Sequence, residues 1–507
     1  MKNPKVLYFT PEMKPFAQAG GVACVAGELP PELKKKGVDI SVVMPLYKCA
    51  KNVSDLKPVK SYSVKCHGNE EKIEILRGEH EGVEVLFVKN RHFEEKINDR
   101  DYGKVFVDSL HPFYDDALRF SVFAEACLPL IAERNPDIVH GQDWPTGLLF
   151  GRMKQLGMKQ KKVLTVHNVG YQGNVWGGVL KGTTLAEMAG DSKISESFRD
   201  PRYEGVVNCM RLGLESADMS NAVSPRYLEE MLMPENSDTF FQGGAGLENV
   251  SRRLHERGKL TGILNGVKYD FEPTRERFDK LIAEKEDAKR AFGNFVGGTA
   301  NTLFGFVGRA VDQKFALLRE SLGDRTVLEH ILEMPGVSSG ILASGQEYEP
   351  FIWQVGTPRF SGNVNYDELL KMNKRGNYFP FPLFDSSLRS LINLASDFVL
   401  VPSKYEPCGI VQLEALRDAT PPICNSTGGL FNTVKGFQDI NSTGWLFSGN
   451  NRDELLRNLL NAVDEAKTLR TKHPEKYREM QWRAFNERFD WKKPAEEYCK
   501  MYEQLLK

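Results

Sequence analysis

Short apolar runs alternate with helix-like segments along two long stretches of the chain. The first stretch opens with an apolar run at residues 6–10, followed by a helical pattern over 21–36 and a second apolar run at 40–44. A similar alternation restarts at 302–307 and continues to the run at 398–401. Strands that alternate with helices are typical of parallel sheets covered by helices. The sequence therefore predicts an α/β fold with two doubly wound, Rossmann-like domains.

The stretch between the two cycles predicts a hinge. The chain has 507 residues, which is enough for two to four domains of roughly 150 residues each. Charged residues crowd positions 251–259, and a strand and turn follow at 262–266. We therefore expect domains at 1–255 and 256–480, and a C-terminal helix at 481–507 that closes back on the body.

Charge and cysteine usage exclude several classes of protein. The 67 basic and 68 acidic side chains nearly cancel, so the chain has no overall positive field for nucleic acid or an anionic membrane. Its eight cysteines show no redox or zinc spacing, which predicts free thiols in a reducing compartment. The first apolar run is too short for a signal peptide, and no later run is long enough to span a membrane. We expect a cytoplasmic protein.

Polar residues follow two apolar runs in the first half. His140 and Asp143 come at the end of the run that starts at 138, and His167 and Asn168 follow the run at 163–166. Ligands of open α/β sheets bind outside the carboxyl ends of the strands, so these four side chains are expected on one rim. Each histidine by itself could instead be a buried hydrogen-bonding residue.

Glycines open the first predicted helix. Gly20 and Gly21 stand between the strand-like run at 6–10 and the helix. Free N–H groups at such a helix start could meet a phosphate, although a glycine pair can also serve only as a turn. Neither the G-x-G-x-x-G fingerprint nor the G-x-x-x-x-G-K-[ST] phosphate loop occurs, which disfavours nicotinamide enzymes and ordinary ATPases.

Charged candidates lie in the second half. Arg309 and Lys314 follow the run at 302–307 and could clamp a diphosphate, arginine as a fork and lysine as a point charge. Glu406 follows the run at 398–401, and Glu414 is expected two helical turns later. The acidic pair at Asp99 and Asp101 has the composition of a solvated loop rather than a metal site.

Eight short motifs are spread along the chain. They are Gly20-Gly21, His140-x-x-Asp143-Trp144, Thr165-Val-His-Asn-Val-Gly-Tyr-Gln172, Asn221-Ala-Val-Ser-Pro225, Gly262-Ile-Leu-Asn-Gly266, Gly308-Arg309 with Asp312-Gln-Lys314, Glu406-Pro-Cys-Gly409 and Ser426-Thr-Gly-Gly429. In their identity and order they resemble the motifs of bacterial glycogen synthases and plant starch synthases, and the resemblance covers nearly the whole chain. The resemblance implies a GT-B fold, with an acceptor-side and a donor-side domain facing across a cleft. It also implies transfer of glucose from a nucleotide-glucose, ADP-glucose or UDP-glucose, to the non-reducing end of an α-1,4-glucan with retention, without metal or cofactor.

The same resemblance implies roles for individual residues. Arg309 and Lys314 would hold the donor diphosphate, Glu406 would hold the donor glucose and oppose positive charge at its anomeric carbon, and His167 would line the sugar. The other implied donor-binding residues are Gln18, Gly20, Gly21, Asn221, Glu414, Thr427, Gly428 and Gly429. His140, Asp143 and Asn168 would line the cleft or acceptor side.

The chain departs from the family pattern at three positions. Gln18 and Cys24 stand where the family usually has lysine and aspartate, and Glu414 completes a Glu-x7-Glu pair known from a wider group of retaining transferases. These changes leave two alternatives open: a catalytically degenerate glucan-binding or regulatory protein on the same fold, or a related transferase with a different donor. The aromatic residues Phe351, Trp353 and Phe360 are expected to fill a core rather than to contact an acceptor.

Overall fold

Two compact units make up the computed structural model, which describes residues 3–97, 100–101, 103–106, 114–299, 301–344, 376–381 and 385–507. Unit 1 comprises Met1–Glu235, Gly243–Gly266 and Asp490–Lys507. Unit 2 comprises Asn236–Gln242 and Val267–Phe489. Asp99 and the three aromatic residues at 351, 353 and 360 lie outside the described residues.

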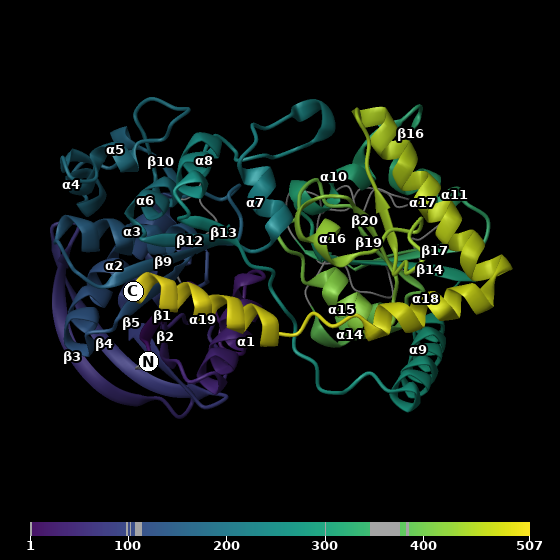
Figure 1. The fold of residues 1–507 in the computed structure, drawn as a ribbon, viewed down its shortest axis with the longest axis horizontal. Coiled ribbons are helices and arrows are strands. Elements are labelled where there is room, and N and C mark those ends of the chain that lie inside the picture. The colour runs from purple at the N-terminus through teal and green to yellow at the C-terminus, as the bar shows by residue number, and fades with distance from the viewer. Residues whose placement is uncertain are drawn as a thin grey trace. The chain divides into compact units, whose positions relative to one another are not determined.

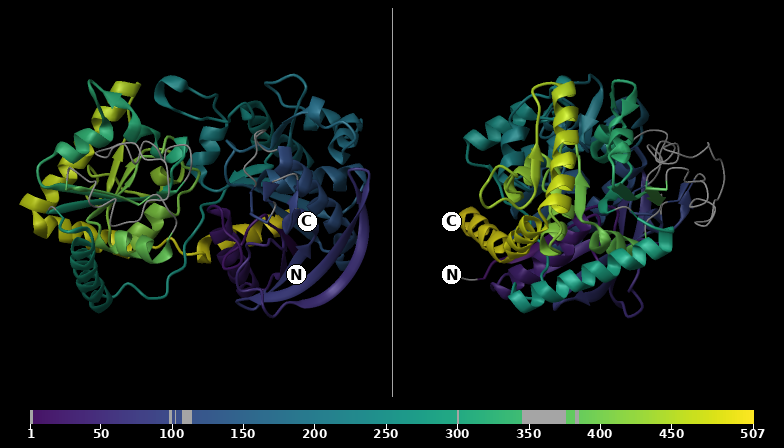
Figure 2. Two further views of the ribbon diagram at one scale, coloured as in Figure 1. Left: turned by 180° about the vertical axis from the view of Figure 1, so that it is seen from behind. Right: turned by 90° about the vertical axis from the view of Figure 1, so that its right-hand side faces the viewer.

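Unit 1 is built on a nine-stranded sheet with the order β13-β12-β9-β8-β1-β2-β5-β4-β3. The strands are β1 (Lys5–Phe9), β2 (Asp39–Pro45), β3 (Lys57–Cys66), β4 (Asn69–His80), β5 (Val83–Lys89), β8 (Ile138–Gln142), β9 (Lys161–Val166), β12 (Met219–Ala222) and β13 (Leu260–Gly262). Strands β13 to β5 run parallel, and the antiparallel β3–β4 hairpin forms one edge of the sheet and curves around the unit (Figures 1 and 2). The central strands β1, β8, β9 and β12 are buried along most of their length, as expected for parallel strands with both faces covered.

Helices pack around this sheet in two groups. The main helices are α1 (Val22–Lys35), α2 (Tyr114–Arg134), α3 (Asp143–Gln155), α6 (Cys209–Ser216), α7 (Pro225–Met231), α8 (Glu248–Glu256) and α19 (Lys492–Leu506). Helices α2, α3 and α6 pack in series, and α1 packs against α19. Between β9 and β12 the chain makes an excursion through β10 (Asn174–Trp176), a 3₁₀ turn (Gly177–Val179), α4 (Thr184–Gly190), α5 (Ser195–Phe198) and β11 (Val206–Asn208).

Unit 2 has a six-stranded parallel sheet with the order β18-β17-β14-β19-β20-β21. Its strands are β14 (Thr302–Arg309), β17 (Val337–Ser344), β18 (Tyr378–Phe381), β19 (Phe398–Val401), β20 (Pro422–Asn425) and β21 (Trp445–Phe447). Its helices are α9 (Arg275–Val296), α10 (Asp312–Arg319), α11 (Val327–Glu333), α14 (Ser386–Ala395), α15 (Val411–Arg417), α16 (Gly428–Thr433), α17 (Arg452–Lys472) and α18 (Pro474–Asn486). The expectation of two parallel, Rossmann-like α/β domains is confirmed.

The unit boundaries differ from those expected. The chain leaves unit 1 after Gly266 rather than after residue 255, because β13 pairs with β12 and so keeps α8 and β13 in unit 1. The expected closing segment 481–507 is divided, with the end of α18 in unit 2 and α19 in unit 1. Part of the charged loop near residue 100 forms a small ladder between Lys96–Ile97 and Arg100–Asp101. Among the described helices, none combines the length and apolar character needed to cross a bilayer.

Candidate active site

Asp143 connects the ends of two neighbouring strands of unit 1, β8 and β9. It is the first residue of α3, directly after β8, and its φ of 56° is positive. Its Oδ1 accepts the backbone N–H groups of His167 (2.6 Å) and Asn168 (3.3 Å), which follow β9. His167 Nε2 lies 2.8 Å from Gln142 Oε1 and donates to it, since an amide oxygen only accepts. The structure therefore brings Asp143, His167 and Asn168 together, as expected.

Burial sets the protonation of this group. Burial raises the pKa of Asp143 to about 7, with the nearby Glu12 carboxylate adding to the rise and the two backbone N–H bonds opposing it. Burial lowers the pKa of His167 to about 3, so the imidazole is neutral at physiological pH. Asp143 is thus a carboxyl group that exchanges a proton near neutral pH.

Glu12 is a site residue that the sequence reasoning missed. Its side chain is buried, and its carboxylate accepts the backbone N–H groups of Ala19 and of Gly20, the latter at 2.8 Å. These bonds close the loop that leads into α1. The signal was present, because Glu12 follows the end of β1 just as Asp143 follows the end of β8.

The two departures from the family pattern in this loop lie together. Gln18 is exposed, and its Nε2 donates to the carbonyl oxygen of Gly20 (3.3 Å) and lies 3.7 Å from Cys24 Sγ. Cys24 is buried in the first turn of α1, whose N-cap is the exposed Gly21. The loop is thus held by neutral contacts of Gln18 and by the Glu12 carboxylate.

His140 does not join the rim, which corrects the expectation, and Asn221, for which the resemblance implied donor binding, is buried beside it. Both are fully buried. The ring nitrogens of His140 bond to Tyr502 Oη (2.7 Å) and Thr165 Oγ1 (2.8 Å), while Asn221 bonds to Thr165 Oγ1 and Tyr498 Oη. Side chains alternate between the faces of a strand, and here they point to the face that α19 covers. Burial lowers the pKa of His140 to about 3, and the network serves to hold α19 on the sheet.

Glu406 is the centre of the candidate site in unit 2. It lies in the loop between β19 and α15, with 5% of its surface exposed. Its Oε2 forms an ion pair with Lys314 Nζ from α10 and accepts a hydrogen bond from Ser403 Oγ (2.9 Å). Lys314 therefore contacts a carboxylate rather than standing ready as a phosphate clamp alone, and Arg309 is exposed at the end of β14.

Two glycines have a packing role beside Glu406. Gly429 N–H donates to the carbonyl oxygen of Glu406 (3.0 Å), and Gly428 has a φ of 44°. A Cβ atom at Gly428 would overlap that carbonyl, and one at Gly429 would overlap the backbone of Cys408. Thr427 is the buried N-cap of α16. The close approach of two loops thus requires both glycines.

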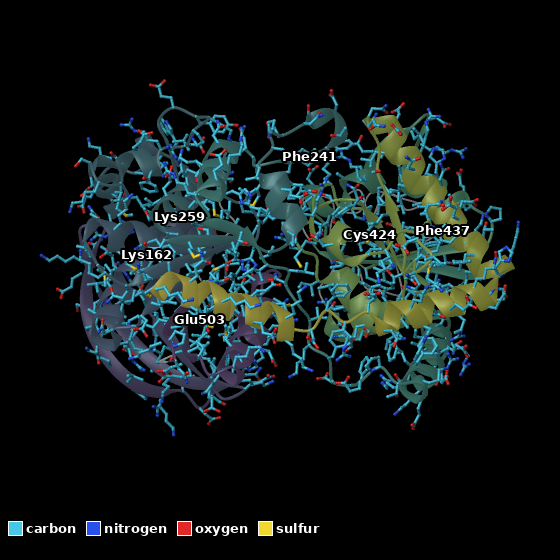
Figure 3. The ribbon with its side chains drawn as sticks, in the orientation of Figure 1. Lys162, Phe241, Lys259, Cys424, Phe437 and Glu503 are labelled. Atoms are coloured by element: carbon cyan, nitrogen blue, oxygen red, sulfur yellow. The ribbon has the colours of Figure 1, made fainter. Side chains whose placement is uncertain are left out.

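Further ion pairs surround this loop. Glu414 on α15 pairs with Arg389 on α14, and Lys404 pairs with Asp312 at 2.7 Å. Cys424 of β20 lies in the interior of unit 2 (Figure 3), where burial and the Glu406 carboxylate raise the pKa of its thiol. Within the described part of the chain, His, Cys, Asp and Glu side chains form no group of three that could hold a metal ion.

Comparison with known proteins identifies the family. The family model of the starch synthase catalytic domain matches residues 5–253, and that of the group 1 glycosyl transferases matches 361–480. Glycogen synthases of Clostridioides difficile (strain 630) and Exiguobacterium sibiricum are 30% and 31% identical to this chain, and the alignments cover 99% and 98% of both sequences, respectively. The catalytic domain of starch synthase IV from Arabidopsis thaliana has the same fold, with a TM-score of 0.79, 24% identity and 99% coverage of both chains. The chain therefore belongs to the glycogen and starch synthase family of glucosyltransferases, and its two parallel α/β units are the Rossmann-like domains of the GT-B fold.

Proposed function

We propose that this glucosyltransferase uses ADP-glucose and adds glucose to the non-reducing end of an α-1,4-glucan with retention. The observation that carries the proposal is the ion pair between the partly exposed Lys314 and the buried Glu406, which places a positive and a negative side chain side by side. The choice of ADP is supported by the similar starch synthase IV, whose structure was determined bound to ADP and acarbose.

The proposed roles in unit 2 follow from charge. As the bond to the diphosphate breaks, negative charge grows on the leaving group and positive charge grows at the anomeric carbon. Lys314 and Arg309 stabilise the leaving diphosphate, and the Glu406 carboxylate stabilises the anomeric carbon. Ser403 and Lys314 fix the orientation of that carboxylate before the donor binds, so little reorganisation is needed.

The proposed roles in unit 1 follow from neutral hydrogen bonding. Asp143, with a pKa of about 7, both donates to and accepts from sugar hydroxyls near neutral pH. The neutral imidazole of His167 lines the sugar without adding charge. We also propose a cytoplasmic location, because all eight cysteines are free.

One assay separates this proposal from its alternatives. Purified protein is incubated with glycogen and either ADP-glucose or UDP-glucose, and nucleoside diphosphate release and glucose incorporation are measured. Faster incorporation from ADP-glucose is expected. Faster incorporation from UDP-glucose would reject the donor, and the Arg389–Glu414 pair would then be the first candidate for the altered pocket. No incorporation from either donor would favour a glucan-binding or regulatory protein, the alternative raised by Gln18 and Cys24.

A further inference from the structure

A short loop between helices α7 and α8 belongs to unit 2, although both helices belong to unit 1. The chain leaves unit 1 for Asn236–Gln242 and then returns to it. The loop closes on itself, because Asn236 and Phe241 exchange two backbone hydrogen bonds of 2.8 Å each. Its 3₁₀ turn η3 (Ser237–Thr239) lies against α17 of unit 2. Figure 3 marks the loop at Phe241.

Phe240 anchors this loop on unit 2. Its ring packs against the large apolar core of that unit, and the ammonium of Lys404 lies 4.8 Å from the ring centroid. The backbone of Phe240 is left-handed, with a φ of 57°. This conformation suits glycine and is rare for a bulky residue, so the contacts of the ring must outweigh the strain. The ring's contacts with the core and with Lys404 therefore hold the loop in place.

Lys404 is the first residue of a segment that is joined to the start of α10, contact by contact and in the same order. These contacts are Lys404 Nζ to the Asp312 carboxylate (2.7 Å), Lys404 N–H to Gln313 O (2.8 Å), the Gln313 amide to Tyr405 O (3.0 Å) and the Lys314–Glu406 ion pair. The last of them is the charged pair of the candidate site. Phe240 contacts the ammonium that makes the first.

The ion pair of Lys404 needs support from a second partner. The Asp312 carboxylate is 48% exposed, and water screens an ion pair at such a position. An aromatic ring beside the ammonium adds a second attraction and restricts the lysine side chain. Phe240 supplies that ring.

We propose that Phe240 is a positioning residue for glycosyl transfer. Its ring holds Lys404 against Asp312 and so keeps residues 404–406, with the Glu406 carboxylate, in place beside residues 312–314. The inference rests on the proposed function for the reaction that Glu406 serves, and not for the contact between Phe240 and Lys404.

Hydrogen exchange tests the positioning independently of activity. Phe240→Gly removes the ring and suits the left-handed backbone. In peptides that contain Lys404, exchange at its amide should become about tenfold faster in Phe240→Gly and stay near the wild-type rate in Phe240→Tyr. Phe437→Ala is the matched control, because Phe437 packs against the same core and stacks on Trp445 at 4.9 Å. It should lower the melting temperature and leave this exchange unchanged.

Kinetic measurements separate positioning from packing. With ADP-glucose and glycogen, Phe240→Gly should lower kcat about tenfold and change the donor KM less than about twofold, because the displaced carboxylate acts in the transition state. Phe240→Leu fills the core but has no ring face, so it should lose nearly as much, whereas Phe240→Tyr should keep kcat. In Lys404→Met the ring has no cation to hold, so a further Phe240→Gly change should lower kcat little more.

Three results would overturn the proposal. Unchanged exchange at Lys404 in Phe240→Gly would show that the ring does not hold this segment. A lower melting temperature with unchanged kcat would show that the ring only packs. Losses that multiply in the Phe240→Gly, Lys404→Met double variant would show that the ring acts elsewhere. A wild-type protein that transfers no glucose, with faster exchange in Phe240→Gly, would reject the proposed function and leave the contact between Phe240 and Lys404 standing.

Discussion

The candidate site residues of the two units are held by different interactions. In unit 1, Asp143 is held by backbone N–H groups and His167 by the neutral amide of Gln142. In unit 2, Glu406 is held by the ammonium of Lys314, and Glu414 by a guanidinium. Unit 1 thus fixes these groups through uncharged partners, of the main chain and of one side-chain amide, and unit 2 fixes them through opposite charges.

The difference indicates how the work is divided. Hydrogen bonds to the backbone do not change partner easily, so the unit 1 group has a fixed arrangement that suits sugar hydroxyls. Ion pairs between side chains can exchange partners when a charged ligand arrives. The pairs of unit 2 therefore suit a ligand that carries its own charge, such as a nucleoside diphosphate. Four substitutions can break or sharpen this comparison.

Removal of the Glu406 carboxylate in unit 2 should have the largest effect on activity. Glu406→Ala is expected to lower kcat/KM by about a thousandfold, on the order of 4 kcal/mol, because it removes the charge that stabilises the anomeric carbon. Thermal unfolding should remain close to that of the wild type. Glu333→Ala, which truncates a partly exposed glutamate of the same unit, is the control and should keep full activity. Retention of more than a tenth of the wild-type turnover by Glu406→Ala would reject the assignment.

The raised pKa of Asp143 in unit 1 should be detectable in the pH dependence of the protein's thermal stability. Folding raises the pKa of Asp143 from 3.8 to about 7, so between these values the folded state binds more protons than the unfolded state. Its contribution to stability is full below pH 4 and is lost as the pH rises through 7. Asp143→Asn cannot ionise and tolerates the positive φ. From pH 5 to pH 8 its melting temperature should rise relative to that of the wild type, by an amount equivalent to about 3 kcal/mol. A constant difference across that range would show that Asp143 is not held protonated.

Lys285 of unit 2 is an exception to the contrast between neutral partners in unit 1 and opposite charges in unit 2. Lys285 of α9 is buried, and its Nζ donates to the carbonyl oxygens of Leu394 (3.0 Å) and Ser396 (3.2 Å) and to Thr420 Oγ1 (2.5 Å). It is thus held by uncharged groups, mostly of the main chain, like the polar groups of unit 1. Burial lowers its pKa from 10.5 to about 8.

The contribution of Lys285 to the stability of the protein should therefore increase in mild alkali. Between pH 8 and 10.5 the unfolded chain retains the Lys285 proton and the folded chain does not, so this residue's contribution to stability rises with pH. The melting temperature of the wild type should rise relative to that of Lys285→Met from pH 7.5 to 9.5, equivalent to about 2 kcal/mol. A difference that does not depend on pH would mean that the buried ammonium keeps its ordinary pKa.

The sequence predicted the fold well because buried parallel strands are continuous apolar runs. The run at 6–10 became Lys5–Phe9, and the helix expected at 21–36 is α1, Val22–Lys35. The rule that ligands meet the carboxyl ends of strands predicted that Asp143 and His167 lie together, and the structure places them in contact. The rule failed for His140, because the partner that buries this side chain, Tyr502, stands 362 positions later.

The ion pair of Glu406 could not be predicted for the same reason. Lys314 stands 92 positions before Glu406, and no local sequence pattern predicts the contact. Gly428 and Gly429 were expected to approach a phosphate, and the structure adds their close approach to the Glu406 loop. Contacts between distant segments are the part of a site that a single sequence does not reveal.

Replacement of Gln18 by the family's lysine should have the smallest effect. Gln18 is exposed, and its amide group contacts the carbonyl oxygen of Gly20 and the sulfur of Cys24. A lysine at this position would extend into solvent, where screening limits a single charge to about 1 kcal/mol or less. The nearby Glu12 carboxylate is already satisfied by two backbone N–H groups, so it does not require a cation. We therefore expect Gln18→Lys to change kcat/KM for ADP-glucose by less than about fivefold, with Gln18→Met as the uncharged control. A rise of tenfold or more in Gln18→Lys alone would mean that charge, and not only neutral hydrogen bonding, acts in unit 1, and the contrast between the two units would then fail at this loop.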